Sequence, residues 1–575
     1  MSDPPRAAPF RMDLLKVILE DYFHVQAFDK IVHRRHWDCF ETRLEINTRK
    51  TLDLLDRFDI KATFFVLGWI AEQYPAIVRE VASRGHEIAS RGYQRRNIRE
   101  MTPAEFREDL SRAREALERA GGKRVLGHYA AISWTDPSDL WALDVLAEEG
   151  YAYDSSVAPI GRSFRSEPWR RFPHVHRFGG RELWEFPRSS WDLMGWQIPI
   201  SGGNYFRQFP HTLVKRLVES WHRSYDAPFV MYFNVWELDP DLPRLNAASP
   251  LARIRQYRNL DKMSWVLEDY FRRYRFVGIA EYMGLHSAAD LVPIPRPEGP
   301  SRITPKSFEP DRGEGKTPVS IVVPCFNEEH VLPFLANTLR SVQEAMREKY
   351  DVRFLFVDDG STDDTWNSLR RIFGSRPDCT ILRHETNRGV AAAILTGIRA
   401  AETGIVCSID CDCSYDPHEL MNMIPLLAEN VDMVTASPYH PHGQVLNVPK
   451  WRLALSKTLS FLYRRVLRQK LATYTSCFRV YRRSAVADLT VREGGFLGVA
   501  EMLGTMDLKG ARISEYPATL EVRLLGRSKM KVCRTVLGHL GLLARLLSVR
   551  LFRLQGSPQG SGQVLPTHPQ ERGKR

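Results

Sequence analysis

The stretch of sequence that most constrains the fold of this chain runs from Ile405 to Asp412. Apolar and small residues lead there directly into Asp410-Cys411-Asp412. A short apolar run of this kind predicts a strand inside a parallel sheet, with the acids where the chain leaves the sheet. Side chains at positions i and i+2 of an extended segment point the same way, so Asp410 and Asp412 can share one ligand. Two hard oxygen donors at the carboxyl end of a strand predict a site for Mg²⁺ or Mn²⁺, held together with a diphosphate.

Length and charge narrow the possible functions. The 575 residues are enough for two large α/β domains, and the net charge of +12 indicates an anionic partner such as a nucleotide, a lipid phosphate or a membrane surface. Nucleic acid is not expected as a partner, because no nucleic-acid-binding motif accompanies the charge. The eight cysteines form no disulfide framework, which favours a reduced cytoplasm. No signal peptide and no transmembrane helix are predicted, so we expect a cytoplasmic protein on the inner face of the membrane.

The N-terminal half alternates predicted strands and helices. After a disordered tail at residues 1–12, apolar runs at 14–19, 62–67 and 86–90 alternate with amphipathic segments as far as residue 285. Such alternation predicts a parallel, barrel-like α/β domain over residues 13–285.

Five segments of this half, in order, resemble polysaccharide deacetylases of the NodB type. They are residues 20–25, 85–90, 153–156, 202–207 and 232–240. The resemblance implies a distorted (β/α) barrel. It also implies a metal held by one Asp and two His, with an Asp base and a His acid, that hydrolyses N-acetyl groups.

The chain departs from that family where the chemistry is performed. Ile18 replaces the strand-1 Asp, Arg91 and Arg95 replace the two metal histidines, and Asn234 replaces the late His. A guanidinium cannot ligate a divalent cation, and Asn cannot deliver a proton. We therefore predict an inactive pseudo-deacetylase without a metal, in which the surviving Asp21 and His86 are expected to be structural.

Other features of this degenerate site leave alternatives open. Residues 129–131 read Tyr-Ala-Ala where the family has Arg-Ala-Pro, and His86 is retained. Arg91, Arg95 and Arg96 either make the old pocket an anion or acidic-sugar site or are ordinary solvated arginines.

A Pro-rich linker, residues 286–316, separates this half from a second α/β domain at 317–531. Apolar strands at 319–323 and 354–357 each end in polar residues, and Asn327 is expected to cap the helix that follows the first. The pattern predicts a Rossmann-like mononucleotide-binding half, without a dinucleotide or P-loop fingerprint.

Four ordered motifs of this domain resemble family 2 glycosyltransferases of GT-A fold. They are Val-Pro-Cys-Phe-Asn-Glu-Glu at 323–329, Val-Asp-Asp-Gly-Ser-Thr-Asp at 357–363, Asn-Arg-Gly-Val-Ala-Ala-Ala at 387–393, and Asp410-Cys411-Asp412. Segments 451–456, 475–479 and 523–529 extend the resemblance to the polyprenyl-phosphate branch, which resembles dolichol-phosphate-mannose synthases. One departure is Ala-Ser-Pro-Tyr at 436–439, where that branch often has Gly-Ser-Arg-Tyr.

The resemblance and the residue chemistry assign expected roles. The metal and catalytic residues are Asp410 and Asp412, with Arg479 as a further catalytic residue. The residues expected to bind the nucleotide-sugar are Pro324, Phe326, Glu328, Asp358, Asp359 and Arg388. Those expected to bind the acceptor phosphate are Arg452, Ser456, Arg523 and Lys529. A phosphate acceptor needs no strong base, whereas a sugar hydroxyl would need a carboxylate such as Asp416 or Glu501.

The C-terminal region is amphipathic. Residues 532–554 alternate Leu and Val clusters with basic residues and predict either a helix on the membrane surface or one packed on its own domain. Residues 555–575 are expected to be disordered. We predict a glycosyltransferase that moves a hexose from a nucleotide-sugar to a polyprenyl phosphate or related glycolipid, in envelope or exopolysaccharide synthesis, with a pseudo-deacetylase domain that binds glycan or a partner. The alternatives are a bifunctional deacetylase/glycosyltransferase and a non-enzymatic glycan-binding scaffold.

Overall fold

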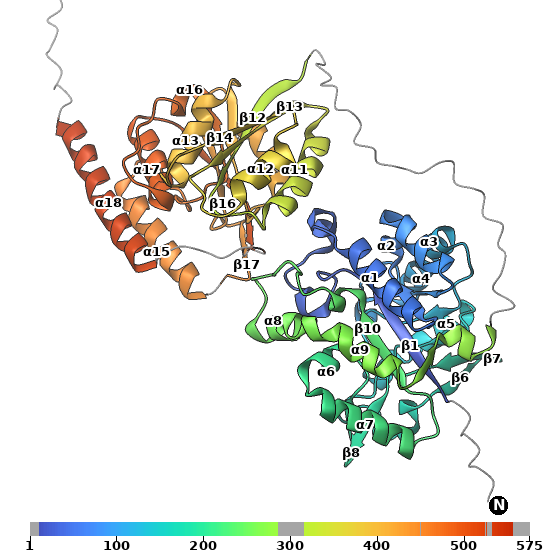
Figure 1. Cartoon of the computed structure of the whole chain (residues 1–575). Helices are drawn as coiled ribbons and strands as arrows, with labels where there is room; N and C mark the ends of the chain where they lie inside the picture. The colour runs from blue at the N-terminus through green and yellow to red at the C-terminus, as the bar shows by residue number, and fades with distance from the viewer. Residues whose placement is uncertain are drawn as a thin grey trace, which may run out of the picture. The chain divides into compact units, whose positions relative to one another are not determined.

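The computed structural model describes residues 11–285, 315–448, 450–521, 523, 525 and 532–555. The chain divides into two compact units, Met1–Glu309 and Pro310–Arg575 (Figure 1). Most of the predicted linker, nearly all of both predicted tails, and Lys529 lie outside the described residues.

The N-terminal unit is built on a nine-stranded sheet, in which most neighbouring strands are parallel. Its main path runs β10 (Val230–Asn234), β1 (Met12–Leu19), β2 (Thr63–Val66), β3 (Glu87–Ser90), β4 (Gly127–His128), β5 (Tyr153–Asp154), β7 (Arg181–Glu185) and β6 (His174–Phe178). Only β6 runs antiparallel to its neighbour, and β11 (Arg275–Val277) pairs with the start of β1. The expected distorted (β/α) barrel is confirmed.

Helices surround this sheet. They are α1 (Leu44–Arg57), α2 (Gly68–Gln73), α3 (Pro75–Ser83), α4 (Pro103–Gly121), α5 (Trp141–Glu148), α6 (Gly203–Gln208), α7 (His211–Ser224), α8 (Pro250–Tyr257), α9 (Met263–Phe271) and α10 (Ile279–Tyr282). A separate hairpin is formed by β8 (Ser190–Leu193) and β9 (Trp196–Pro199). Thr102 and Glu105 form a reciprocal capping box at the start of α4, because each side chain binds a backbone N–H that the helix leaves unpaired.

Alternate residues of β1 point into the barrel. Leu14 and Ile18 pack there with Phe65 and Tyr153 in one buried cluster. Lys16, which lies between them on the same face of the strand, is also fully buried.

The C-terminal unit contains a seven-stranded sheet. Its order is β14 (Cys379–Arg383), β13 (Tyr350–Asp358), β12 (Thr317–Cys325), β15 (Ile405–Ser408), β18 (Arg479–Arg482), β16 (Met433–Ser437) and β19 (Ile513–Pro517). The first four strands are parallel, and β18 runs antiparallel to both of its neighbours. Two short strands, β17 (Gln444–Leu446) and β20 (Thr519–Glu521), pair separately. The expected Rossmann-like GT-A fold is confirmed.

The helices of this unit fall into two groups. Those that follow the sheet strands are α11 (Leu332–Met346), α12 (Thr365–Phe373), α13 (Val390–Ala400), α14 (Leu420–Met423), α16 (Arg483–Val486) and α17 (Gly495–Leu508). The other two, α15 (Lys450–Val466) and α18 (Val532–Gln555), lie side by side along one edge of the unit (Figure 1). Within the described ranges, no helix combines the length and the apolar character needed to cross a bilayer.

For residues 532–554 the sequence predicted either a helix on the membrane surface or one packed on its own domain, and α18 has features of both. Leu542, Leu543 and Leu546 are buried against the domain, so the helix does pack on its own core. Leu537 and Leu551 are 69% and 51% exposed, so a second apolar face remains on the surface.

The predicted cap at Asn327 is wrong. This residue adopts a left-handed backbone conformation with φ of 53°, and its side-chain oxygen accepts hydrogen bonds from the backbone N–H groups of Thr362 and Asp363. The side chain therefore ties two loops together, and α11 begins only at Leu332.

Candidate active site

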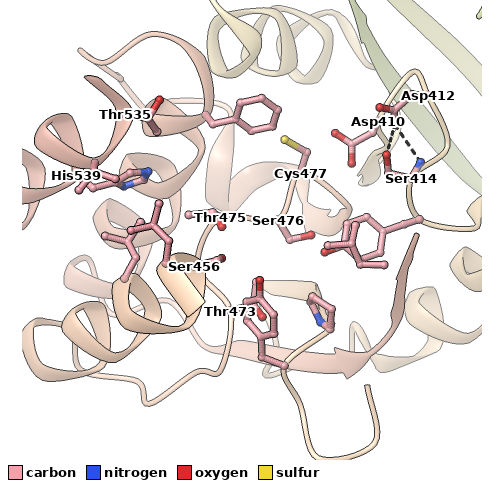
Figure 2. Close-up of a pocket in the computed structure, with 18 of the residues that line it drawn as sticks. Asp410, Asp412, Ser414, Ser456, Thr473, Thr475, Ser476, Cys477, Thr535 and His539 are labelled. Carbon is pink, nitrogen blue, oxygen red and sulfur yellow. Dashed lines mark hydrogen bonds between the residues drawn. The ribbon is translucent and has the colours of Figure 1, made fainter. Parts of the chain in front are cut away.

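The carboxyl ends of β12, β13 and β15 meet at one edge of the C-terminal sheet, where open α/β sheets bind their ligands. Asp410 and Asp412 follow β15 at this edge. Burial, and next the neighbouring Asp412 charge, raise the pKa of Asp410 to about 7. Asp412 accepts hydrogen bonds from Ser414 through the backbone N–H at 3.0 Å and the hydroxyl at 2.6 Å (Figure 2).

This pair fits a hard divalent cation. Two carboxylates held close together at a buried edge repel one another, and a cation between them relieves that repulsion. Carboxylate oxygens are also the donors that Mg²⁺ and Mn²⁺ prefer.

Arg523 lies against the same carboxylates. Its Nε donates to Asp412 Oδ2 at 2.5 Å, and its Nη2 donates to Glu328 Oε1. Despite its burial, the charges of Asp412 and Glu328 raise the pKa of Arg523. Arg523, which was predicted to bind the acceptor phosphate, thus bridges the predicted metal ligand Asp412 and the predicted nucleotide-sugar-binding residue Glu328.

The residues predicted for the nucleotide-sugar shape the neighbouring loops. Asp359 accepts hydrogen bonds from the backbone N–H groups of Arg388 at 2.9 Å and Gly389 at 2.7 Å. Gly389 has φ of 92°, and a Cβ there would lie 2.3 Å from the backbone nitrogen of Gly495, so no side chain fits. Asp359 therefore fixes a turn that only glycine allows.

The remaining predicted nucleotide-sugar residues lie at the same edge. Asp358 is fully buried, accepts a hydrogen bond from the Ser361 N–H and pairs with Arg383 at 3.1 Å. Pro324 and Phe326 are partly exposed at the end of β12, and the side chain of Arg388 is exposed.

Arg479, which was predicted to be catalytic, lies near enough to Asp410 for its charge to act on that carboxyl. It is fully buried, and its guanidinium donates to the backbone carbonyls of Tyr474 at 2.9 Å and Val499 at 3.0 Å. It does not line the cavity described next, because these two carbonyls hold it inside the domain.

A cavity of about 340 Å³ opens beside the two acids. It extends from Asp410 and Asp412 to α15 and α18, where Ser456, Thr535 and His539 face it (Figure 2). Its other lining residues are mainly apolar, aromatic or hydroxyl-bearing: Ser414, Tyr415, Pro438, Tyr439, Trp451, Leu455, Leu459, Thr473, Thr475, Ser476, Cys477, Phe496, Leu520 and Val536. Of the described residues that line it, only Asp410 and Asp412 carry a carboxylate.

Neither candidate base reaches this cavity. The Asp416 side chain accepts a hydrogen bond from the His418 backbone N–H. Glu501 accepts from the backbone N–H groups of Arg492 and Glu493, and it pairs with Arg545 at 2.9 Å. Both carboxylates are therefore committed to structural contacts.

The predicted acceptor residues are only partly brought together. Ser456 lines the cavity, and Arg523 lies beside Asp412. Arg452 lies on α15, whereas Lys529 lies outside the described residues.

The reasoning from sequence missed the hydroxyls of Thr473, Thr475 and Ser476, and also missed His539. Two of these hydroxyls belong to the 475–479 motif and were available as a signal. No sequence motif marks His539. Only the fold brings it to the cavity, where its Nδ1 lies 2.8 Å from the Tyr463 hydroxyl.

In the N-terminal unit, the degenerate site is held together by ion pairs. Arg91 Nε bonds one oxygen of Glu20, and Arg95 Nη1 bonds the other at 3.2 Å. Ile18 is buried in the barrel core. The structure thus favours a packing role for Arg91 and Arg95, since one carboxylate already pairs with both.

The other residues of this site make local contacts. Asp21 accepts hydrogen bonds from the Thr42 hydroxyl at 2.7 Å and the Arg43 backbone N–H at 2.9 Å, and burial raises its pKa to about 6. Asn234 forms a reciprocal capping box with Glu237.

His86 and Arg96 are also occupied locally. His86 Nδ1 accepts a hydrogen bond from the Ala62 backbone N–H, and burial lowers the pKa of His86 to about 4. Arg96 pairs with Glu105 at 3.2 Å.

Comparisons with known families agree with this division. The family described as glycosyl transferase family 2 matches residues 320–490. Polysaccharide deacetylase matches residues 33–135, and a domain of unknown function, DUF3473, matches residues 155–284.

Three relatives each match about two fifths of this chain. Polyprenol monophosphomannose synthase of Mycolicibacterium smegmatis is 29% identical over 238 residues, which cover 39% of this chain and 87% of the relative. Undecaprenyl-phosphate mannosyltransferase of Micrococcus luteus is 29% identical over 218 residues, covering 37% of this chain and 87% of the relative. Dolichol-phosphate mannosyltransferase of Pyrococcus furiosus is 25% identical over 233 residues, covering 40% of this chain and 63% of the relative.

Two solved structures resemble parts of this chain. A structure assigned as a polysaccharide deacetylase from Mycobacterium smegmatis has a TM-score of 0.33 at 18% identity, covering 51% of this chain and 98% of that chain. A mannosyltransferase from Pyrobaculum calidifontis has a TM-score of 0.30 at 18% identity, covering 41% of this chain and 70% of that chain.

Proposed function

Because its C-terminal unit carries a family 2 glycosyltransferase domain and its N-terminal unit a polysaccharide deacetylase domain, we propose that this chain transfers a hexose from a nucleotide-sugar to a polyprenyl phosphate. The observation that carries the proposal is the cavity beside Asp410 and Asp412. Apolar side chains suit a lipid, and hydroxyls near the acids suit a phosphate. The polyprenyl-phosphate relatives support the same acceptor.

The cavity also favours a phosphate acceptor over a sugar hydroxyl. A hydroxyl nucleophile needs a general base within hydrogen-bond reach, and neither Asp416 nor Glu501 lines the cavity. A phosphate oxygen is already ionised, so it needs only positioning and charge stabilisation.

The proposed mechanism assigns simple roles to the chain's residues. Asp410 and Asp412 would hold Mg²⁺ or Mn²⁺, which neutralises the departing diphosphate when bound. Asp359 shapes the turn at Gly389 beside the nucleotide-sugar, and Ser456 and Thr475 donate hydroxyl hydrogens to the acceptor phosphate.

The N-terminal domain is proposed to bind glycan or a partner without deacetylating it. Arg91 and Arg95 stand where two metal ligands are expected, and both are paired with Glu20. Ile18, in place of the strand-1 acid, is buried in the barrel core. A cation there would meet two fixed positive charges and would have to compete with them for Glu20. The deacetylase family match would instead favour a bifunctional enzyme, and acetate release from N-acetylated glycans distinguishes the two.

The membrane is the proposed site of action, with the chain peripheral on the inner, cytoplasmic face. The exposed Leu537, Leu540 and Leu551 of α18 and the exposed Trp451 and Phe461 of α15 support this placement. An amphipathic helix with basic residues binds anionic lipid surfaces in this way.

The test is a transfer assay on the full-length protein. A panel of UDP- and GDP-sugars is supplied with Mn²⁺, with and without a short polyprenyl phosphate. We expect transfer only with the lipid phosphate, abolition by EDTA, and loss of activity by a factor of about a hundred or more in Asp412→Asn. Full activity of Asp412→Asn, or transfer to a neutral glycan but not to the lipid phosphate, would contradict the proposal.

A further inference from the structure

The mouth of the N-terminal barrel carries positive charge that the Glu20 ion pairs do not neutralise. Lys16 Nζ donates to Ser155 Oγ at 2.7 Å and lies 4.2 Å from the centre of the Tyr129 ring. Arg188 follows β7, and its Nη1 donates to the Tyr232 hydroxyl at 3.2 Å. Two cations therefore converge on two tyrosines inside the barrel, and Tyr129 and Arg188 follow β4 and β7 at the strand ends where barrels bind their ligands.

Among the described residues, neither cation pairs directly with a carboxylate, although Glu185 and Asp154 lie near enough to Lys16 to interact with its charge. In the described ranges, neither Lys16 nor Arg188 forms a salt bridge with a carboxylate, and Arg188 Nε is buried without a hydrogen-bond partner. The nearby Asp154 is committed to His128, 2.7 Å away. Burial, and next the charge of Asp154, raise the pKa of Glu185 well above its usual range.

The pKa of Tyr129, which lies between the cations, is shifted by their positive charge. Although burial raises its pKa, the positive charges of Lys16, Arg91 and Arg188 bring the pKa of Tyr129 down to about 8. Arg91 lies 4.5 Å from the centre of this ring. Unpaired charge in a buried setting is costly, so an anion that enters here is stabilised.

We propose that this barrel mouth binds the anionic group of a saccharide, through Arg188 and the hydroxyl of Tyr232, with Lys16 and Tyr129 beneath. Tyr205, on α6, is near enough to Arg188 to interact with its charge. The inference rests on the proposed non-catalytic role of this domain and names the chemistry of its ligand.

The ligand class follows from the side chains. A guanidinium pairs with a carboxylate or a phosphate through two parallel hydrogen bonds. Arg188, Tyr205 and Tyr232 are all partly exposed, so a ligand can reach them. Tyrosine rings offer flat apolar faces to the C–H face of a sugar, and their hydroxyls bind its oxygens. A uronic acid residue and a sugar phosphate both have this shared chemistry.

The test uses the full-length protein and isothermal titration calorimetry with three probes: trigalacturonate, its methyl ester and glucose 6-phosphate. We expect an anionic probe to bind and the neutral ester to bind at least tenfold more weakly. The stronger of the two anions identifies the source, a uronate or a phosphate.

Arg188→Gln should weaken that binding by about tenfold to a hundredfold, because it removes a charged hydrogen-bond donor. Arg188→Lys should restore part of the affinity. Arg119→Gln is the matched control, since Arg119 is a surface residue of α4 with a 61% exposed side chain. Thermal unfolding of each variant shows whether the barrel is intact. If Arg188→Gln fails to fold, Tyr232→Phe is used in its place, because it removes one hydroxyl and keeps the ring.

Three outcomes would overturn the inference: no anionic probe binds, the ester binds as well as the acid, or neither Arg188→Gln nor Tyr232→Phe changes the affinity. Acetate release by the wild-type protein would instead refute the proposed non-catalytic role. The two failures are thus separable.

Discussion

Arg523 and a divalent cation compete for Asp412, so Arg523→Ala should increase the affinity of the protein for Mn²⁺. The guanidinium holds Asp412 Oδ2 at 2.5 Å and also bonds Glu328. A metal ion can use that oxygen only after Arg523 has released it, and the positive charge of Arg523 also repels the cation.

The expected magnitude follows from this contact. A hydrogen bond to a charged group contributes about 1.5–3 kcal/mol, and about 1.4 kcal/mol corresponds to a factor of ten in a binding constant. The Arg523 side chain is 21% exposed, so solvent screening reduces this contribution only modestly. Removing the competing bond should therefore tighten Mn²⁺ binding by about tenfold to a hundredfold.

The assay is a titration of free Mn²⁺ by electron paramagnetic resonance, in the absence of a nucleotide-sugar. Arg347→Ala serves as the matched control, because Arg347 is a 66% exposed residue of the same unit that pairs with Glu344 at 2.8 Å. Arg523→Lys should fall between the wild type and Arg523→Ala. Mn²⁺ binding that is unchanged or weaker in Arg523→Ala would refute the competition.

The other predictions concern the surface, the pH dependence and the core. Leu537→Asp should reduce co-sedimentation with anionic liposomes without loss of fold, since the side chain is 69% exposed, whereas Leu546→Ala should lower the free energy of unfolding by about 2–5 kcal/mol. Equal liposome binding by wild type and Leu537→Asp would show that this face does not meet lipid. Burial raises the pKa of Asp21 from 3.8 to about 6, so the folded state binds this proton more tightly than the unfolded state does. The free energy of unfolding should therefore fall by about 3 kcal/mol as the pH rises from about 4 to about 6. Asp21→Asn should remove that part of the pH dependence of urea unfolding, and an unchanged profile would contradict it. Arg207→Ala should cost about 3–5 kcal/mol in the same assay, because it leaves the buried Glu237 without the cation that lies 2.8 Å away. A loss below about 1 kcal/mol would argue against the pair.

Features set by short stretches of chain were predictable from the sequence. The apolar run before Asp410 and Asp412 predicts a strand that ends in acids, and β15 is that strand. Thr102 and Glu105 lie three residues apart, the spacing of a capping box, and they form one. In each case the interacting groups are neighbours in sequence, so local pattern is enough.

Roles that depend on distant contacts were not predictable. Arg523 pairs with Asp412, 111 residues away in the sequence, and Arg91 pairs with Glu20, 71 residues away. Arg479 has the residue type of a phosphate ligand, yet two backbone carbonyls hold it inside the domain. The same guanidinium chemistry suits a ligand, a carboxylate or a carbonyl, and only the fold decides which partner is within reach.

The helix α18 shows how one element can join a lipid surface to a reaction site. Thr535, His539, Leu542 and Leu546 fall on one side of a helix with 3.6 residues per turn, and the first two line the cavity. Four exposed leucines of this helix fall on the opposite side: Leu537, Leu540, Leu547 and Leu551. Under the proposed function, the lipid-facing and cavity-facing sides of α18 are separated by about 10 Å, the diameter of a helix with its side chains. A polyprenyl phosphate would then reach the acids with its phosphate while its chain stays at the membrane surface.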